Sequence, residues 1–490
     1  MSIAPSVEKI GGTSISSTET VLANVLLGGR SGADLYNRIF VVSAYGGITD
    51  LLLDRKKKKP GDDMPSGLYA CFTAEDSSVS WEEALTAVDA AMRAKNAEIF
   101  EGPERGIADS FVAGRIAGIR ACIQDLDRLR GHGHFRLDEP LATLRELLAG
   151  FGEAHSAHNT TLLLRAKGVN ACFVDLTGWD DQLWLDLDER IRIGLDDINF
   201  ATTLPIVTGY ARCKGGMVKQ FDRGYTEMTF ARLAVLTGAR EAIIHKEFHL
   251  SSADPKLVGP DKARKIGQTN YEVADQLAGL GVEAIHPGAA RGLRQAGISL
   301  RVRNTFDRYD DGTLISAHYH SDSPRIEIVT GLSDVTALEF FEHDMVGTKG
   351  YDAGILEVLT KHGAKIVSKA SNANTITHYL AARPSVVRQV VADLEARFSN
   401  AEINAKRVSM VSIIGTDISQ PGLELQAMQA LQNAKVTVLA MQHQLRNVDV
   451  QFIVAQDQFD RTIQALHVAL VESDTSDSTL ASERPLARVA

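Results

Sequence analysis

The chain has few cysteines and no long apolar run, and both absences narrow its class. Its 490 residues include only four cysteines, none of them in a C-x-x-C pair, which argues against a disulfide framework and against a cysteine-built metal site. No stretch approaches eighteen apolar residues, and the amino terminus lacks a basic region followed by a long apolar run. We therefore expect reduced thiols, no bound structural metal and a cytoplasmic location.

The chain also has no excess of basic residues. The 52 Lys and Arg residues are outnumbered by 62 Asp and Glu, for a net charge of −10, which argues against nucleic acid or an anionic membrane as the main partner. The one conspicuous basic run, residues 55–59, is interpreted as a solvated loop. A hydrophobic fraction of 44% is ordinary for a globular protein, and the length suggests two to four domains.

The first candidate site is a glycine turn near the amino terminus. An apolar strand over residues 7–10 leads into Gly11 and Gly12, and a helix is expected to follow, started by a capping-box pattern at residues 16–19. Adjacent glycines let backbone N–H groups approach an anion closely, and Lys9 places a cation beside them. Because a lone Gly-Gly pair is usually an ordinary turn, the phosphate interpretation depends on other segments.

A second strand supplies that support. Residues 39–42 form another apolar strand, followed by Ser43, a glycine pair at residues 46–47 and Thr49. In open α/β sheets ligands gather at the carboxyl ends of strands, so two such ends predict one shared site. Neither turn matches the G-x-x-x-x-G-K-[ST] phosphate loop, and no G-x-G-x-x-G follows a strand, so the P-loop and Rossmann interpretations are not supported.

The chain divides into a large first part and a repetitive second part. Up to about residue 307 strands alternate with helices, which is typical of an α/β domain. Residues 307–324 are polar and are expected to form the boundary. Beyond them a βαββαβ-type unit is expected twice. The first copy comprises a strand at 335–342, a helix at 353–362, strands at 364–369 and 375–380, and a helix at 385–398; the second comprises a strand at 408–414, a helix at 423–433, strands at 435–441 and 448–455, and a helix at 459–471.

Phosphoryl transfer requires that charge on the moving group be neutralised and that donor and acceptor be held in line. Lys9 with the neighbouring amides can do the first. An anionic acceptor needs a cation, and Arg223 offers a planar fork for a carboxylate. If the acceptor also carries an ammonium group, Glu153 or Glu227 would balance it. A dicarboxylic amino acid satisfies all of these requirements.

Several motifs resemble those of aspartate kinases, within the amino-acid kinase superfamily. They are Lys-Ile-Gly-Gly-Thr-Ser at residues 9–14, Val-Val-Ser-Ala-Tyr-Gly-Gly-Ile-Thr at 41–49, Gly152-Glu153 with Ser156, Ile-Val-Thr-Gly-Tyr at 206–210, Asp-Arg-Gly-Tyr-Thr-Glu at 222–227, Ala-Asp-Pro-Lys at 253–256 and Ile-His-Pro at 285–287. They extend over nearly the whole chain. The sequence is most similar to the branch of aspartate kinases associated with ectoine biosynthesis.

The resemblance implies a three-layer αβα sandwich with a mainly parallel sheet, followed by two ACT-like regulatory modules. The implied boundaries are 1–323 for the kinase domain, 324–400 and 401–473 for the two modules, and 474–490 for a polar tail. Such modules pair edge to edge, which implies a homodimer or higher homo-oligomer and a possible amino-acid effector, although a sheet edge favours self-pairing without any ligand.

The resemblance also assigns site residues and substrates. Mg-ATP would donate its γ-phosphoryl to the side-chain carboxylate of L-aspartate, giving 4-phosphoaspartate and ADP. Lys9 would stabilise the transferred group, and Arg223 would hold the α-carboxylate of aspartate. Further substrate contacts would come from Ser43, Thr49, Glu153 and Glu227, and nucleotide contacts from Lys9, Gly11, Gly12, Thr13, Lys246, Asp254 and Lys256. Effector contacts would come from Met345, Gly347, Gly350, Asp352, Asn372 and Asn374.

Departures from the family pattern leave alternatives open. Glu227 stands where related kinases have Asp, and Tyr225 replaces a small residue. Residues 244–246 are Ile-His-Lys where Trp-Thr-Asp is usual, and Glu283 stands where a Lys is common. The alternatives are a kinase of glutamate or another carboxylate and a non-catalytic amino-acid sensor, although Lys9 argues against the sensor. Residues 442–447 differ from the turn expected in the second module, so weak feedback by lysine and threonine is expected.

Overall fold

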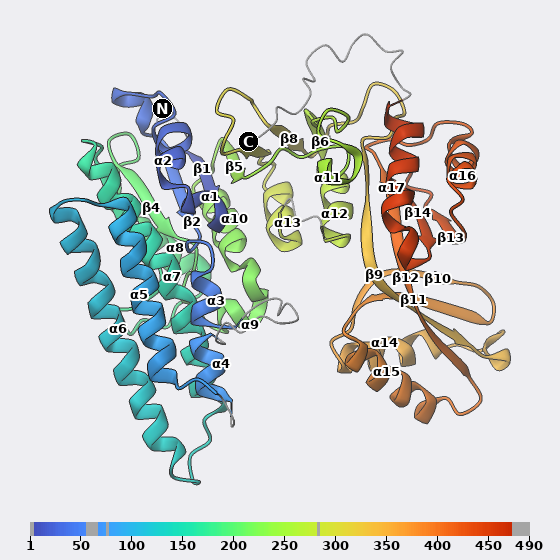
Figure 1. The fold of residues 1–490 in the computed structure, drawn as a ribbon, viewed down its shortest axis with the longest axis horizontal. Helices are drawn as coiled ribbons and strands as arrows, with labels where there is room; N and C mark the ends of the chain where they lie inside the picture. Colours follow the sequence, from blue (N-terminus) through green and yellow to red (C-terminus); the bar gives the residue numbers. More distant parts are fainter. Residues whose placement is uncertain (1–3, 55–66, 75–77, 282–284, 473–490) are drawn as a thin grey trace. The chain divides into compact units, whose positions relative to one another are not determined.

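The computed structural model describes residues 4–54, 67–74, 78–281 and 285–472 (Figure 1). The predicted basic run at 55–59, the departure at Glu283 and the tail at 474–490 lie outside the described residues. The chain forms two compact units. The first unit comprises Met1–His249 and Ile285–Ala317, and the second comprises Leu250–Ala284 and His318–Ala490.

A mainly parallel sheet forms the centre of the first unit. Its strands lie in the order β3-β4-β2-β1-β5-β7-β8, and every neighbouring pair is parallel except β7 with β8. All five residues of β1, β2 and β4 are buried, as expected of strands covered on both faces. The strands are β1 (Ser6–Ile10), β2 (Arg38–Val42), β3 (Ala171–Val174), β4 (Leu204–Thr208), β5 (Glu241–Lys246), β7 (Leu300–Asn304) and β8 (Thr313–Ser316).

Helices cover both faces of this sheet. The helix α7 packs against β2, β3 and β4, and shares one core cluster with the long α5 and α6 and with η1. The helix α10 packs against β1, β2 and β5, and α8 and α13 lie against it. The helical segments are α1 (Gly12–Ser16), α2 (Thr18–Val21), η1 (Leu22–Leu27), η2 (Gly32–Leu35), α3 (Ile48–Leu52), α4 (Leu68–Thr73), α5 (Trp81–Ile99), α6 (Pro103–Arg130), α7 (Asp138–Ala166), α8 (Leu187–Leu195), α9 (Met217–Phe221), η3 (Asp222–Gly224), α10 (Tyr225–Leu236) and α13 (Pro287–Gln295).

Local sequence explains several helix starts, and one prediction is wrong. Ser80 with Glu83, and Asp186 with Glu189, form capping boxes that begin α5 and α8. The capping box predicted at residues 16–19 does not form, because a short helix, α1, already begins at Gly12 and ends at Ser16. The Ser16 hydroxyl instead donates to the Gly12 carbonyl oxygen, 2.8 Å away.

The second unit is built on one antiparallel sheet in the order β10-β11-β9-β12-β14-β13. Its predicted alternation of strands and helices is confirmed, although β9 and β12 begin earlier than expected. The elements are α11 (Pro255–Val258), β6 (Gln268–Asn270), α12 (Tyr271–Gly279), β9 (Ile328–Phe341), η4 (His343–Met345), α14 (Tyr351–Lys361), β10 (Lys365–Ser371), β11 (Thr375–Ala381), α15 (Pro384–Arg397), β12 (Glu402–Ile414), α16 (Leu423–Asn433), β13 (Val438–His443), β14 (Asp449–Val454), η5 (Gln456–Gln458), α17 (Phe459–His467) and η6 (Val468–Glu472).

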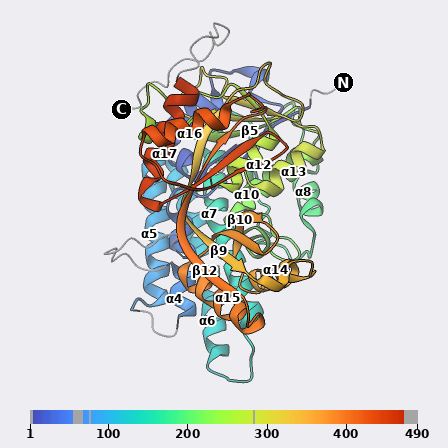
Figure 2. The same cartoon turned by 90° about the vertical axis from the view of Figure 1, so that its right-hand side faces the viewer.

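Two α+β modules share the long strands β9 and β12 (Figure 2). One core contains Leu338 and Phe340 from the second half of β9, with α14 and α15. The other contains Val329 from the first half of β9, with α16 and α17. The modules are therefore interleaved along the chain, since each takes part of both strands. The domain boundaries at residues 323, 400 and 473 stay a prediction.

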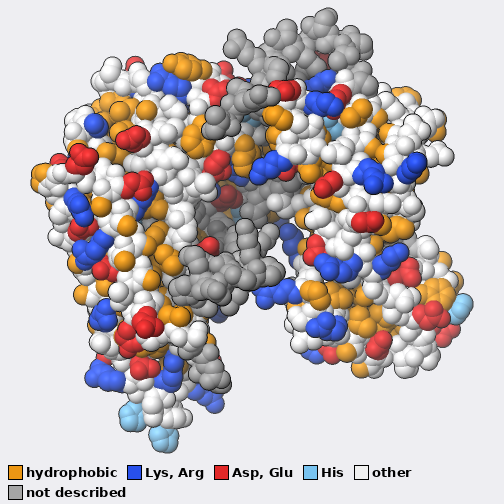
Figure 3. Space-filling model, viewed as in Figure 1, with side chains coloured by type: hydrophobic (Ala, Val, Ile, Leu, Met, Phe, Trp, Pro, Cys, Tyr) orange, Lys and Arg blue, Asp and Glu red, His pale blue; other side chains and the backbone are white. Residues whose placement is uncertain are grey.

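The surface agrees with a chain of mixed charge. On the face shown in Figure 3, basic and acidic side chains are interspersed. Among the described residues, no helix combines the length and the apolar character that crossing a membrane requires. All four cysteines are free thiols.

Candidate active site

The two predicted glycine turns meet beyond the ends of β1 and β2. The Ser16 hydroxyl accepts a hydrogen bond from the amide of Gly46 at 2.7 Å, and thereby ties the second turn to the first. A Cβ atom added at Gly12 would lie 2.7 Å from the carbonyl oxygen of Ala44, so only glycine allows the turns to pack this closely. The two strand ends that were predicted to share a site therefore lie together in the fold.

Lys9 and Glu227 form an ion pair at this place. Lys9 lies near the end of β1 and Glu227 in the first turn of α10, and the Lys9 Nζ is 3.2 Å from the Glu227 Oε1. Their side chains are 11% and 12% exposed, so both are largely withdrawn from solvent without being sealed in. A cation with a single carboxylate partner can still turn to a bound anion.

The other carboxylate oxygen of Glu227 is engaged too. The backbone amide of His286 donates a hydrogen bond to it, and His286 itself caps α13. Burial alone would raise the pKa of Glu227, but Lys9 and Lys246 outweigh burial and lower it. Glu227 is therefore ionised at neutral pH, and the side chain of Lys246 lies close enough to act on it.

Glu153 is the least satisfied polar group of the site. It lies in α7, is 2% exposed, and its Oε1 accepts a hydrogen bond from the Thr226 hydroxyl at 2.6 Å. Its Oε2 is buried and accepts no hydrogen bond from the described residues. Burial raises the pKa of Glu153 to about 8, against the opposing effects of the Thr226 hydroxyl, of Lys9 and of the backbone amides of Tyr210 and Ala44. Such a carboxylate gains most from a cationic ligand.

Gly209, just after β4, lets the chain pass close beside Glu153. A Cβ atom there would lie 2.6 Å from the Glu153 Oε2 and 2.3 Å from the Thr226 Cγ2, so only glycine allows this close approach. One turn further along α7, the Ser156 hydroxyl donates to the Ser43 carbonyl oxygen at 2.8 Å and fixes the end of β2. Thr49 lies in the first turn of α3, after Gly47 in the left-handed conformation.

The structure brings part of the predicted site together. Lys9, Glu227 and Glu153 converge, because Thr226, the partner of Glu153, directly precedes Glu227 in α10. Ser43 and Thr49 are half-buried, while Thr13 is exposed. The backbone of Arg223 lies in η3 immediately before α10, but its side chain lies outside the described structure. Asp254 and Lys256 belong to the second unit, where the Asp254 carboxylate accepts from the Lys256 amide and begins α11.

Two residues near the site differ from what the sequence indicated. Tyr225 was expected to alter substrate fit, but its side chain is 3% exposed and packs edge-to-face against Tyr210, with ring centroids 5.6 Å apart. Its bulk therefore belongs to the core. Thr226 was not singled out, although it is the only described hydroxyl that donates to Glu153. The sequence signal that could have indicated Thr226 is its position directly before Glu227, at the start of a helix.

The predicted effector residues lie around α14 and the turn between β10 and β11. Gly350 caps α14 with a φ of 106°, and Gly347 also has positive φ. The Asp352 carboxylate is 2.5 Å from the Lys369 Nζ, so it already has a cationic partner. Met345 is buried. In the turn, the Asn372 side chain accepts from the amides of Asn374 and Thr375, so it shapes the turn.

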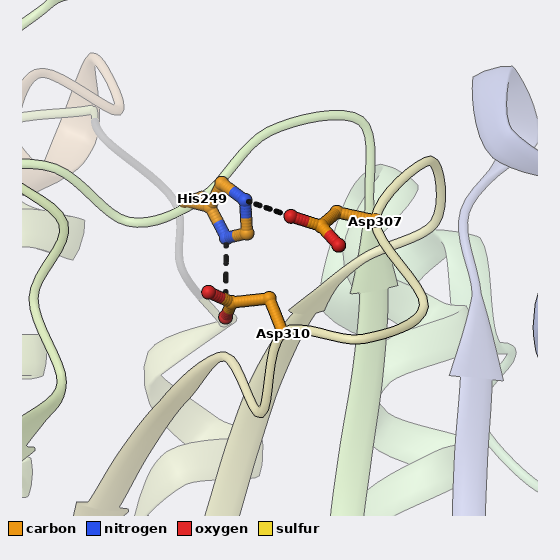
Figure 4. A group of neighbouring side chains, drawn as sticks. All are labelled: His249, Asp307 and Asp310. Atoms are coloured by element: carbon orange, nitrogen blue, oxygen red, sulfur yellow. Dashed lines mark ion pairs between the residues drawn. The ribbon is translucent and has the colours of Figure 1, made fainter. Parts of the chain in front are cut away.

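A cluster that the sequence analysis did not single out lies elsewhere in the first unit (Figure 4). The ring of His249 lies between Asp307 and Asp310, with Nε2 and Nδ1 each 3.7 Å from one carboxylate. One ligand atom from each residue lies within 4.8 Å of the others, a spacing that a cation can bridge. Because the two carboxylates approach different ring nitrogens, the arrangement suits an ion pair that holds the β7–β8 loop against the end of β5.

Comparison with known proteins defines the class. The chain matches the model of the amino acid kinase family over residues 5–304, which include every strand of the first unit listed above except β8. The chain belongs to that family. This region carries Lys9, Glu153 and Glu227.

The nearer relatives are aspartate kinases. The chain is 45% identical to the aspartate kinase Ask_Ect of Stutzerimonas stutzeri over 97% of its own length and 99% of that protein. It is 23% identical to the chloroplastic aspartokinase 3 of Arabidopsis thaliana, with 81% of this chain and 72% of that protein covered. The resemblance drawn from the motifs is thereby confirmed, including the branch associated with ectoine.

Solved structures agree on the fold. The Escherichia coli aspartokinase III in complex with aspartate and ADP aligns with 95% of this chain and 99% of its own, with a TM-score of 0.71 and 18% identity. The same protein with lysine and aspartate gives a TM-score of 0.69. At these identities the likeness shows a common fold: an amino-acid-kinase sandwich followed by regulatory modules.

Proposed function

We propose that this chain is an aspartate kinase that transfers the γ-phosphoryl group of ATP to the side-chain carboxylate of L-aspartate, giving 4-phospho-L-aspartate and ADP. The observation that carries the proposal is the pairing of two unlike groups in one site. Lys9 is a largely buried cation at a glycine turn, and Glu153 is a buried carboxylate with an open oxygen. The near-full-length likeness to an aspartate kinase supports the same assignment.

Each group suits one part of the reaction. The Lys9 ammonium and the amides after β1 offer positive charge to the transferred phosphoryl, whose oxygens carry the charge in the transition state. Glu153 suits the ammonium group of aspartate, because a buried carboxylate whose Oε2 lacks a hydrogen-bond partner is stabilised by a nearby cation. The attacking carboxylate of the substrate is already ionised at neutral pH, so no general base is needed.

The other assigned residues complete the proposal. Arg223 would hold the α-carboxylate of aspartate, and Ser43 and Thr49 would contact the same substrate. Glu227 would hold Lys9 in place until the phosphoryl group arrives, since its carboxylate bridges Lys9 and the His286 amide. Gly11, Gly12, Thr13, Lys246, Asp254 and Lys256 would bind the nucleotide. ATP would enter as its Mg²⁺ complex, in which the cation would offset part of the phosphate charge.

The second unit would serve regulation and assembly. Its edge strands, β10 and β13, leave backbone groups available for pairing with another copy, which supports a homodimer or higher homo-oligomer. The segment around Gly347, Gly350 and Asp352 would bind an amino-acid effector. The name of the S. stutzeri relative supports a role in supplying aspartate semialdehyde for ectoine.

The test is ATP consumption by the purified full chain with aspartate, glutamate or no acceptor, with hydroxylamine added to trap an acyl phosphate. We expect aspartate-dependent turnover, formation of the hydroxamate, and loss of both in Lys9→Ala. The exposed Lys167→Ala is the matched control and should retain activity. Turnover with glutamate alone would favour the other carboxylate kinase. Amino-acid binding without turnover would favour the sensor.

A further inference from the structure

A second charged pocket lies in the first unit, on the opposite face of the sheet from Lys9. Successive residues of a strand point to opposite faces, so Glu8 faces away from the Lys9 side chain, and His245 likewise faces away from Lys246. The pocket forms around Glu8 and lies beneath the carboxyl-terminal end of η1. Its lining residues are Glu8, Asn24, Val25, Gly28, Arg30, Arg38, His245, Arg303, Asn304 and Arg308.

Four of these residues are arginines, against a single carboxylate. The carboxylate is fully used. Glu8 Oε1 accepts from the Arg38 Nε at 2.7 Å, and its Oε2 lies 2.8 Å from the His245 Nε2. Arg38 is 2% exposed and also donates to the carbonyl oxygens of Leu26 and Val25, each at 2.7 Å. Glu8 and Arg38 therefore balance each other and form the floor of the pocket.

The three remaining arginines have no acidic partner among the described residues. Arg303 donates only to the carbonyl oxygens of Arg308 and Asp310, which leave its charge uncompensated. Arg308 stacks on Tyr309, with its guanidinium carbon 4.8 Å from the ring centroid. Arg30 is half-buried, and burial and the charges of Arg38 and Arg303 lower its pKa, against the opposing effect of Glu8. The wall of the pocket thus carries three arginines that have no ion-pair partner among the described residues.

The backbone makes room for these guanidinium groups. A Cβ atom at Gly28 would lie 2.5 Å from a terminal nitrogen of Arg30, and one at Gly29 would lie 2.6 Å from a terminal nitrogen of Arg308. Both glycines have positive φ. Any side chain at these positions would displace the arginines, so the turn after η1 fits them as they stand. Converging cations held by a shaped backbone are an arrangement that a multivalent anion stabilises.

We propose that this pocket is a binding site for a phosphate group, either free phosphate or the phosphate of a small monoester. Arg30 from the turn after η1, Arg303 from β7 and Arg308 from the β7–β8 loop approach from three segments of the chain, which suits a tetrahedral anion better than a planar carboxylate. The pocket is distinct from the phosphoryl-transfer site, because the sheet separates Glu8 from Lys9. The proposal does not depend on the proposed kinase activity.

Binding is tested on the full chain carrying Lys9→Ala, which removes the main phosphate-binding cation of the other face. The affinity for inorganic phosphate, glycerol 3-phosphate and citrate is measured by calorimetry at fixed ionic strength in chloride. We expect both phosphates to bind, and Arg308→Gln and Arg30→Gln each to weaken the binding by about 10-fold or more. Arg308 is exposed, so its variant should fold normally.

The matched control is Arg232→Gln, which removes an arginine paired with Asp188 outside the pocket and should leave phosphate affinity unchanged. Equal weakening by the control, or unchanged affinity in both pocket variants, would overturn the proposal. Citrate binding more tightly than either phosphate would overturn the assigned ligand class. Inorganic phosphate binding more tightly than glycerol 3-phosphate would identify the free ion as the ligand, and the reverse order a monoester.

Discussion

The state of Glu153 gives the sharpest prediction. Its pKa of about 8, against an ordinary value of 4.5, means that the folded chain holds this carboxyl protonated at neutral pH. The difference corresponds to about 5 kcal/mol in favour of the protonated form. Because the unfolded chain loses this proton near pH 4.5 and the folded chain near pH 8, the stability of the free protein falls as pH rises between those values. The fall is about 1.4 kcal/mol per pH unit.

Substitution of Glu153 by Gln removes this term. The variant should match the wild type near pH 4.5 and become progressively more stable than it as the pH rises to 8, as followed by urea unfolding. The matched control is Glu327→Gln in the second unit. Glu327 is also buried, and its pKa is also raised by burial, but both of its oxygens accept from threonine hydroxyls, those of Thr269 and Thr416.

Binding of the substrate should distinguish Glu153 from its control, Glu327. If the ammonium group of aspartate pairs with Glu153, binding at pH 7 must ionise a carboxyl that is mostly protonated, and must release a proton. Calorimetry in buffers of different ionisation enthalpy measures this number. The release should persist in Glu327→Gln, and Glu153→Gln should lose it together with most aspartate affinity. Aspartate binding by the wild type without proton release would refute the reasoning.

Three further predictions concern the turns, the buried ion pair and regulation. Gly12→Ala should lower the free energy of unfolding by about 1–3 kcal/mol and abolish most turnover, because its Cβ would press on the Ala44 carbonyl oxygen. Gly11→Ala should fold normally, because the nearest atom to its Cβ lies 3.7 Å away. Thermal unfolding of the two variants tests this difference. Glu8→Gln should cost about 3–5 kcal/mol at pH 7, because it leaves Arg38 buried without its carboxylate. Burial would raise the pKa of Glu8, but Arg38 and His245 hold it well below its ordinary value. The stability difference between wild type and variant should therefore shrink as the pH falls through this lowered pKa, because the wild type then loses its ion pair too. Urea unfolding at several pH values measures the difference. Lysine or threonine should inhibit turnover only weakly, and strong inhibition by either in the activity assay would contradict the interpretation of residues 442–447.

Local patterns in the sequence were enough to predict most elements of the fold. The helix at 423–433 occurs with the predicted bounds, because it has a plain apolar pattern and a clear end. The interleaving of the two modules was beyond this reasoning. It depends on β9 and β12 pairing along most of their length, and such pairing joins residues that are 61 to 86 positions apart.

The candidate site shows the same division between local and distant causes. Lys9 and Glu153 were found from motifs, but the sequence gives no indication that Glu153 has one open oxygen or that Thr226 satisfies the other. Likewise, a bulky Tyr225 in a substrate motif suggests an altered pocket, and only the packing against Tyr210 shows that the ring points into the core. Burial and partner choice arise from contacts between α7, α10 and the strand ends.

The central sheet also explains how the two proposed anion sites could coexist in one unit. In β1 the neighbours Glu8 and Lys9 point to opposite faces, and in β5 the neighbours His245 and Lys246 do the same. Each face therefore has its own charge balance: Lys9 and Lys246 act on Glu227, while Arg38 and His245 act on Glu8. A ligand that changes the balance on one face must act on the other through the same two strands, and their buried, paired backbone resists displacement. Phosphate in the arginine pocket should therefore alter aspartate kinetics only if β1 or β5 moves. A change in KM or kcat on adding phosphate to the wild type, absent in Arg308→Gln, would detect this movement.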